Sequence, residues 1–131
     1  MRTKSSGPKF SAIYHWEMKL PAYLLLSVYG RALLIEFRRK YNTHNNGDIA
    51  MSVRQAAQAL GCCLARAFKT LGELEDKGWI RPMQTGSFHW KTDAGGRKYK
   101  AATTWRITNQ AIDLGTDTKA TKEYMKWTPE I

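Results

Sequence analysis

The apolar residues of this chain recur at two different spacings along its length. From about Pro21 to Tyr41 they lie three or four residues apart, which predicts helix, and proline is favoured in a first helical turn. Gly30 lies inside this stretch, at a position where it can divide the helix into two. Arg31, Arg38 and Arg39 fall off the apolar stripe and are expected to point away from it.

A second helical region follows a loop. Asn42 to Gly47 has the composition of a turn, and Asp48 to Met51 is predicted to be a short strand. Ser52 then suits the N-cap of a helix over Val53 to Leu60, which Gly61 would end.

The next helix is predicted over Cys63 to Lys77, with Gly78 directly after it. Four of its residues at helical spacing would form the core side, namely Ala67, Thr70, Leu71 and Leu74. Three others would lie nearer to the solvent, namely Leu64, Arg66 and Lys69.

Beyond Gly78 apolar and polar residues alternate, which predicts strands. The strands are expected over Trp79 to Met83, Ser87 to Lys91 and Thr103 to Thr108, with four aromatic residues in the core: Trp79, Phe88, Trp90 and Trp105. Thr92 to Ala101 is predicted to be a long basic hairpin loop with two glycines at its tip. In the tail, Ala120 to Trp127 is a candidate short helix that would dock Met125 or Trp127 on the core.

The composition excludes several classes of protein. The 131 residues are 43% hydrophobic and 24% charged, which fits one globular domain. No apolar run reaches the length of a membrane span, and residues 1–9 are basic and lack the apolar stretch of a secretory signal, so we expect a cytoplasmic protein with no membrane association. The formal net charge of +10 predicts a polyanionic partner.

No group of side chains has the spacing of a catalytic or metal site. Cys62 and Cys63 are adjacent, which prevents an ordinary long-loop disulfide, and we interpret them as a small buried residue and a helix-start residue. His15, His44 and His89 are scattered, without the partners of a triad or a metal pair. We therefore expect no catalytic residue, no metal, no cofactor and no enzyme activity.

The order of helix, short strand, helix, tight turn, helix and basic hairpin is that of a winged helix-turn-helix, an α+β fold. In this fold the second helix of the pair enters the DNA major groove, and the hairpin contacts the backbone or the minor groove. We assign residues 10–108 to this domain, residues 1–9 to a flexible basic arm, and residues 109–131 to a C-terminal tail that packs on the domain.

Several motifs also resemble one family. Leu60 to Ile80 (LGCCLARAFKTLGELEDKGWI) resembles the helix pair of bacterial winged-helix regulators and replication proteins, with Cys63 and Arg66 in place of the usual Ser and Thr. The ordered set of NNG (residues 45–47), GSF (residues 86–88) with Lys91, ATTWRIT (residues 102–108) and ATKEYMKW (residues 120–127) resembles a winged-helix family of alphaproteobacterial plasmids, phages and integrated elements. In that family, similar domains form the first part of replication initiators. The resemblance supports DNA binding more strongly than it supports initiation of replication.

The charges of the predicted second helix point in the same direction. Arg66 and Lys69 lie in its first half and Glu73, Glu75 and Asp76 in its second half, which is the reverse of what the helix dipole favours. Residues 81–106 hold six basic residues against one acid, a local charge of +5. For both sets the alternative is solvated surface charge with no binding role. Arg38, Arg39 and Lys40 form a third basic cluster, for which phosphate contact and a solvated helix end are the two interpretations.

These observations predict a sequence-preferring double-stranded DNA-binding protein, a small transcription or replication regulator of a mobile element. Arg66 would read guanine in the major groove, Leu64 would lie beside it and Lys69 would hold phosphate. Further phosphate contacts are expected from the start of the first helix and from the hairpin, namely Ser52, Arg54, Gln55, Lys91, Arg97, Lys98 and Lys100. The alternative is a winged-helix module that docks on a protein partner, and a homodimer is left open.

Overall fold

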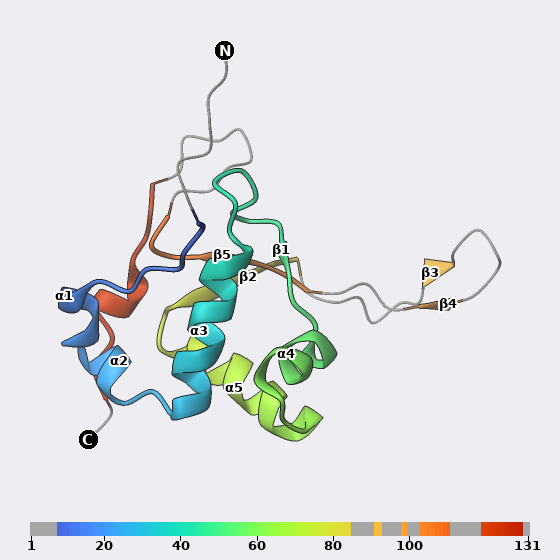
Figure 1. The fold of residues 1–131 in the computed structure, drawn as a ribbon, viewed down its shortest axis with the longest axis horizontal. Coiled ribbons are helices and arrows are strands. Elements are labelled where there is room, and N and C mark those ends of the chain that lie inside the picture. The colour runs from blue at the N-terminus through green and yellow to red at the C-terminus, as the bar shows by residue number, and fades with distance from the viewer. Residues whose placement is uncertain (1–7, 85–90, 93–97, 100–102, 111–118, 130–131) are drawn as a thin grey trace, which may run out of the picture.

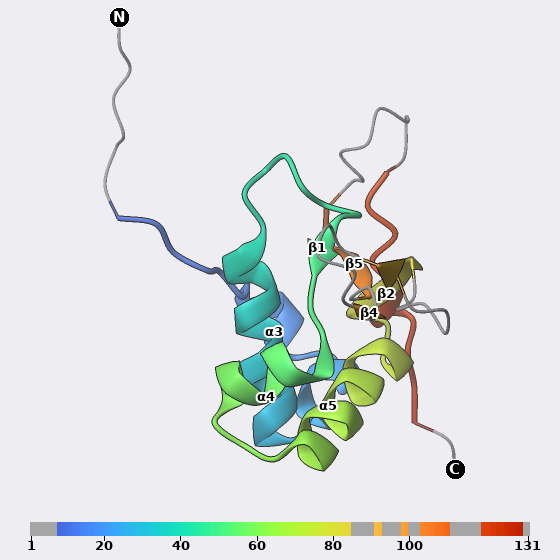
Figure 2. The same cartoon turned by 90° about the vertical axis from the view of Figure 1, so that its right-hand side faces the viewer.

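The computed structural model describes residues 8–84, 91–92, 98–99, 103–110 and 119–129. The helices are α1 (His15–Met18), α2 (Pro21–Leu24), α3 (Val28–Lys40), α4 (Val53–Leu60), α5 (Leu64–Asp76) and the 3-10 helix η1 (Glu123–Met125). The strands are β1 (Ile49–Ala50), β2 (Ile80–Gln84), β3 (Lys91–Thr92), β4 (Lys98–Tyr99) and β5 (Thr104–Ile107). The chain is therefore an α+β protein, in which helices α3, α4 and α5 pack together beside a small sheet (Figures 1 and 2).

The first helical region breaks at Ser27, and the prediction of a break at Gly30 was wrong. Ser27 is the N-cap of α3, where its Oγ accepts a hydrogen bond from the Gly30 N–H at 3.0 Å. Gly30 lies in the first turn of α3, and a Cβ at this position would come within 2.8 Å of Glu73 Oε1. The glycine allows α5 to approach α3 closely.

The helix pair agrees with the sequence prediction. Helix α4 spans Val53–Leu60 as expected, and α5 begins and ends one residue inside the expected bounds. Gly61 adopts the left-handed conformation at the end of α4 (φ +66°), and Gly78 does so after α5 (φ +85°). The four residues expected on the core side of α5 are buried.

The three-stranded antiparallel sheet has the order β1-β5-β2. Ile49 pairs with Trp105, and Ile80 pairs with Ile107, so that segments far apart in the sequence are neighbours. Strands β3 and β4 form a separate ladder, with Lys91 opposite Tyr99, and Figure 1 shows this ladder beyond the end of the sheet. Part of the strand expected over Ser87 to Lys91 lies outside the described residues.

Aromatic residues hold the sheet against the helices. Trp105 packs edge-on against Phe37 of α3, and its indole N–H donates to the Met51 carbonyl oxygen at 3.0 Å. Trp79 is also buried, and its indole N–H donates to the Ala22 carbonyl oxygen at 3.2 Å. The prediction of core positions for these two tryptophans is confirmed, whereas Phe88 and Trp90 lie outside the described residues.

The tail docks through Tyr124. The Tyr124 ring stacks on Trp79 with centroids 4.0 Å apart, and Tyr124 is fully buried. Of the two residues predicted as alternatives for docking, Trp127 is partly buried against the core, whereas Met125 is 49% exposed. The 3-10 turn directs Tyr124 inward. A Cβ on Gly78 would lie 2.8 Å from the backbone of Glu123 and Tyr124. Figure 1 shows η1 beside α1, which lies near the other end of the sequence.

Arg38 lies inside the protein, in contrast to the prediction that it points away. Its guanidinium makes two hydrogen bonds to the Glu17 carboxylate, at 2.9 and 2.8 Å, and both residues are buried. The Tyr124 hydroxyl donates to the same carboxylate at 2.8 Å. Glu17 comes from α1, which the sequence did not predict, and the basic end of α3 therefore has an internal acidic partner. We call Glu17, Arg38, Trp79 and Tyr124 the tail cluster.

The tail cluster changes the pKa of its members. Burial alone would raise the pKa of Glu17, but hydrogen bonds from Arg38 and from the Tyr14 N–H, together with the Arg38 charge, lower it below its ordinary value. Burial and the hydrogen bond to Glu17 raise the pKa of Tyr124. Both shifts keep a charged carboxylate and a neutral phenol side by side.

Candidate nucleic-acid interface

Helix α5 presents a mixed surface to the solvent. Its core side packs on α3 and α4, and Leu64, Arg66 and Lys69 lie on its exposed side, as predicted. Phe68 is 68% exposed as well, and the sequence analysis did not predict its exposure. The helical spacing of α5 could have predicted it, because Phe68 lies outside the stripe of buried residues. We call Leu64, Arg66, Phe68 and Lys69 the outer face of α5.

Arg66 is oriented by α3. Its guanidinium carbon lies 4.9 Å from the centroid of the Tyr29 ring, a cation-π geometry. Tyr29 is in the first turn of α3, so Arg66 leans towards the side of α5 that faces α3. No local sequence signal connects these residues, which are 37 positions apart in the printed sequence.

A cavity of about 370 Å³ lies on the other side of the outer face, between α5 and the sheet. Phe68, Lys69 and Gly72 contribute to it from α5, and Pro82 and Trp105 contribute from the strands. Most of these lining groups are apolar. The outer face of α5 therefore has a cationic edge at Arg66 and an apolar edge at Phe68.

The N-terminus of α4 is closed by its own side chains. The Ser52 Oγ accepts from the Gln55 N–H at 3.1 Å, and the Gln55 Oε1 accepts from the Ser52 N–H at 2.8 Å, which is a capping box. Arg54 is exposed between them. The structure thus gives Ser52 and Gln55 a capping role, and the phosphate contacts expected of all three stay predictions.

The N-terminus of α5 lacks such a cap. Cys63 is the N-cap residue, and its side chain makes no capping hydrogen bond. The interpretation of Cys63 as a helix-start residue is confirmed, and Cys62 is partly buried. Because the first N–H groups of a helix need acceptors, this end of α5 can accept an anionic partner.

Glu73, in the acidic half of α5, has a structural role. Its carboxylate accepts hydrogen bonds from the Ser27 N–H and the Ser27 Oγ, both at 2.7 Å, at the start of α3. One of the three acids that give α5 its unusual polarity is therefore explained by the packing of two helices. The first-half cations Arg66 and Lys69 have no ion pair within the described part of the chain.

The basic residues of the hairpin region divide into two groups. Arg81 of β2 forms an ion pair with Glu123 of the tail, and Arg106 of β5 is buried and donates to Thr121 Oγ1 at 3.2 Å. Burial alone would raise the pKa of Glu123, but hydrogen bonds from Thr121 and Arg81 and the charges of Arg81 and Arg106 lower it. The local charge of +5 thus overstates the charge that the hairpin can offer to a partner.

The structure describes two of the remaining basic residues of the hairpin region. Lys91 and Lys98 belong to the β3–β4 ladder, where Lys98 is opposite Thr92. Arg97 and Lys100, the two other expected contact residues, lie outside the described residues.

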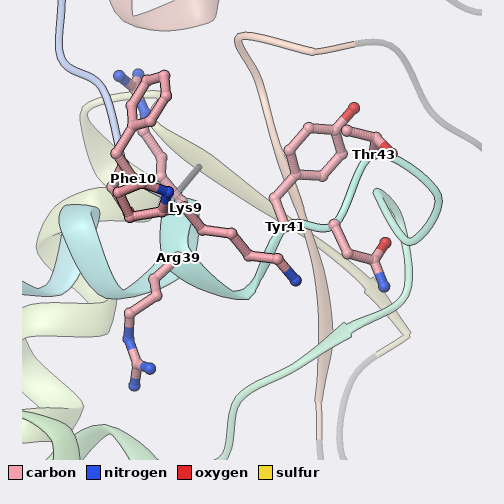
Figure 3. Close-up of a pocket in the computed structure, with 9 residues that line it drawn as sticks. Lys9, Phe10, Arg39, Tyr41 and Thr43 are labelled. Atoms are coloured by element: carbon pink, nitrogen blue, oxygen red, sulfur yellow. The ribbon is translucent and has the colours of Figure 1, made fainter. Parts of the chain in front are cut away.

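A second basic surface lies at the far end of α3. A cavity of about 740 Å³ is lined there by residues that include Lys9, Phe10, Arg39 and Tyr41. Figure 3 shows the Lys9 side chain extending between Phe10 and Tyr41, while Arg39 points away. Ten residues of helix, about 15 Å, separate Arg39 from Tyr29 and hence from Arg66. Lys9 and Arg39 therefore lie on a different surface from the outer face of α5.

Among the described residues, no group of three His, Cys, Asp or Glu side chains could hold a metal ion, and no helix is long and apolar enough to cross a membrane. In comparisons with known proteins, no family model, curated sequence or solved structure matches this chain.

Proposed function

We propose that this chain is a sequence-preferring double-stranded DNA-binding protein with a winged helix-turn-helix fold. The order α3, β1, α4, α5, β2 and β5, with β3 and β4 inserted before the last strand, supports this fold. In this assignment α5 enters the major groove, and the β3–β4 ladder is the wing. The resemblance of the sequence motifs to mobile-element proteins supports a role in transcription or replication of such an element.

The observation that carries the proposal is the contrast in how cations are paired. Arg38 and Arg81 have carboxylate partners, whereas Arg54, Arg66 and Lys69 are exposed and have none within the described part of the chain. A net charge of +10 gives long-range attraction to a polyanion, and Arg54, Arg66 and Lys69 offer it exposed cations on α4 and α5. The open N-terminus of α5 adds N–H donors at the same place.

A protein-docking module is the second candidate, and the exposure of Leu64 and Phe68 favours it. These side chains are 52% and 68% exposed, and exposed apolar groups next to a cavity are typical of protein interfaces. An acidic protein surface would satisfy the neighbouring cations equally well.

Selection of bound duplexes from a random library, followed by affinity measurement at several salt concentrations, separates the two candidates. DNA binding predicts a log-log slope of roughly −4 to −7, for about five to eight neutralised phosphates. Lys69→Ala should reduce this slope by about 1, and Arg66→Ala should weaken the selected site by about 1 to 3 kcal/mol. Ile35→Ala, an exposed change on α3, is the control. No binding at low salt, or a slope near zero, would leave the docking module as the better candidate.

A further inference from the structure

The exposed ring of Phe68 needs an explanation outside the fold. The core side of α5 is complete, with Ala67, Leu71 and Leu74 buried, and Phe68 contributes only part of its surface to the neighbouring cavity. Leu64 precedes it by one helical turn and is also exposed, so the two make an apolar edge along α5.

This apolar edge is separate from Arg66, the residue of the same helix that is expected to contact a base. Residues two apart on an α-helix point about 200° apart, so Arg66 and Phe68 lie on opposite flanks of α5. The contact of Arg66 with Tyr29 holds its guanidinium on the α3 side. Lys69 projects between the two flanks, and a Cβ on Gly72, one turn further on, would meet nothing within 4 Å. The open space at Gly72 allows this turn of the helix to approach a groove floor closely.

The chemistry of the major groove leaves one target for a phenyl ring. Base edges there present hydrogen-bond donors and acceptors, and the apolar group among them is the C5 methyl of thymine. Phe68 has no donor or acceptor, so it can distinguish bases in the groove only through that methyl. On the basis of the DNA-binding function proposed above, we infer that Phe68 selects thymine at one position of the bound site, in addition to any contact that Arg66 makes.

The charge beside Phe68 favours DNA over a parallel pair of α5 helices. Lys69 is the adjacent residue, so two α5 helices packed in parallel through Phe68 would bring their Lys69 side chains together. A duplex instead offers phosphates to these cations while its groove receives the ring.

The test replaces each thymine of a selected duplex by uracil, one at a time, which removes only the methyl group. For the wild-type protein, uracil at one position should weaken binding by about fourfold, the amount expected for one buried methyl. Phe68→Ala should bind the thymine duplex more weakly and should show no difference between thymine and uracil. Phe68→Leu, which keeps an apolar side chain, should retain part of the difference, and Ile35→Ala should retain all of it. Circular dichroism and thermal unfolding check that the variants fold.

The outcomes separate this inference from the proposed function. Duplex binding with no sensitivity to uracil at any position would overturn the role of Phe68 and leave DNA binding intact. Sensitivity to uracil that persists in Phe68→Ala would assign the methyl contact to another residue and overturn the inference in the same way. A wild-type protein that binds no duplex at low salt would overturn both.

Discussion

The tail cluster and the outer face of α5 use charged and aromatic residues in opposite ways. In the tail cluster Glu17 and Arg38 neutralise each other, and Trp79 and Tyr124 stack in the interior. On α5, Arg66 and Lys69 stay without an ion pair in the described part of the chain, and Phe68 is 68% exposed.

The difference separates residues that stabilise the fold from residues left for a partner. A buried ion pair is retained only when hydrogen bonds satisfy it, as the three donors from Arg38 and Tyr124 do for Glu17. Among the residues that the structure describes, no ion pair satisfies Arg66 or Lys69 in this way. Changes in the tail cluster should therefore alter stability, and changes on α5 should alter binding.

The largest effect is expected for Tyr124→Ala. Removing a fully buried aromatic ring should lower the free energy of unfolding by about 3 to 5 kcal/mol, because the Trp79 face and the Glu17 carboxylate both lose a partner. Met125→Ala, at the neighbouring exposed position, should change it by less than about 1 kcal/mol. Urea unfolding followed by tryptophan fluorescence measures both. Equal effects would mean that the tail is not anchored by Tyr124.

Glu17→Gln should follow, with a loss of about 3 kcal/mol, because it leaves the buried Arg38 charge without compensation. Its pH dependence sharpens the prediction. The lowered pKa of Glu17 means that the unfolded chain takes up a proton more readily, so wild-type stability is fully present above the ordinary value of 4.5 and is lost as pH falls through the folded-state pKa. Stability of the variant should fall less steeply over this range. Glu36→Gln, which removes an exposed pair with Arg39, is the control.

Glu73→Ala should cost about 1 to 2 kcal/mol, since it removes the acceptor for both groups of Ser27 at the start of α3. Asp76→Ala, at an exposed position of the same helix, should be nearly neutral. Gly30→Ala provides a second check, because its Cβ would clash with the Glu73 carboxylate. It should be less harmful in the Glu73→Ala background, and additive costs in thermal unfolding would contradict this close contact.

The smallest effect concerns the two groups of hairpin cations. Lys98→Gln should reduce the salt slope of duplex binding by about 0.9 if Lys98 holds one phosphate. Arg81→Gln should leave the slope unchanged, because Arg81 is already paired with Glu123. A reversal of these two results would show that the tail does not neutralise Arg81 in the bound state.

Local features of the fold could be predicted from the sequence because their causes are local. The capping residue Ser52, the left-handed Gly61 and Gly78 and the spacing of apolar residues all act within a few positions, and they predicted helices α4 and α5 to within one residue. Exposure of Leu64, Arg66 and Lys69 followed from the same periodicity.

Only the tertiary structure decided which charged and aromatic residues are already occupied. Glu17 and Tyr124 meet across 107 positions, Ser27 and Glu73 across 46, and Arg81 and Glu123 across 42. Periodicity along one helix cannot predict such pairs. It indicates that a polar residue off the apolar stripe is exposed, and the segment that covers this residue comes from a distant part of the sequence. The sequence by itself therefore determined the helix pair and its solvent-facing side. The packing of α1, α3 and the tail determined which cations remain for a partner.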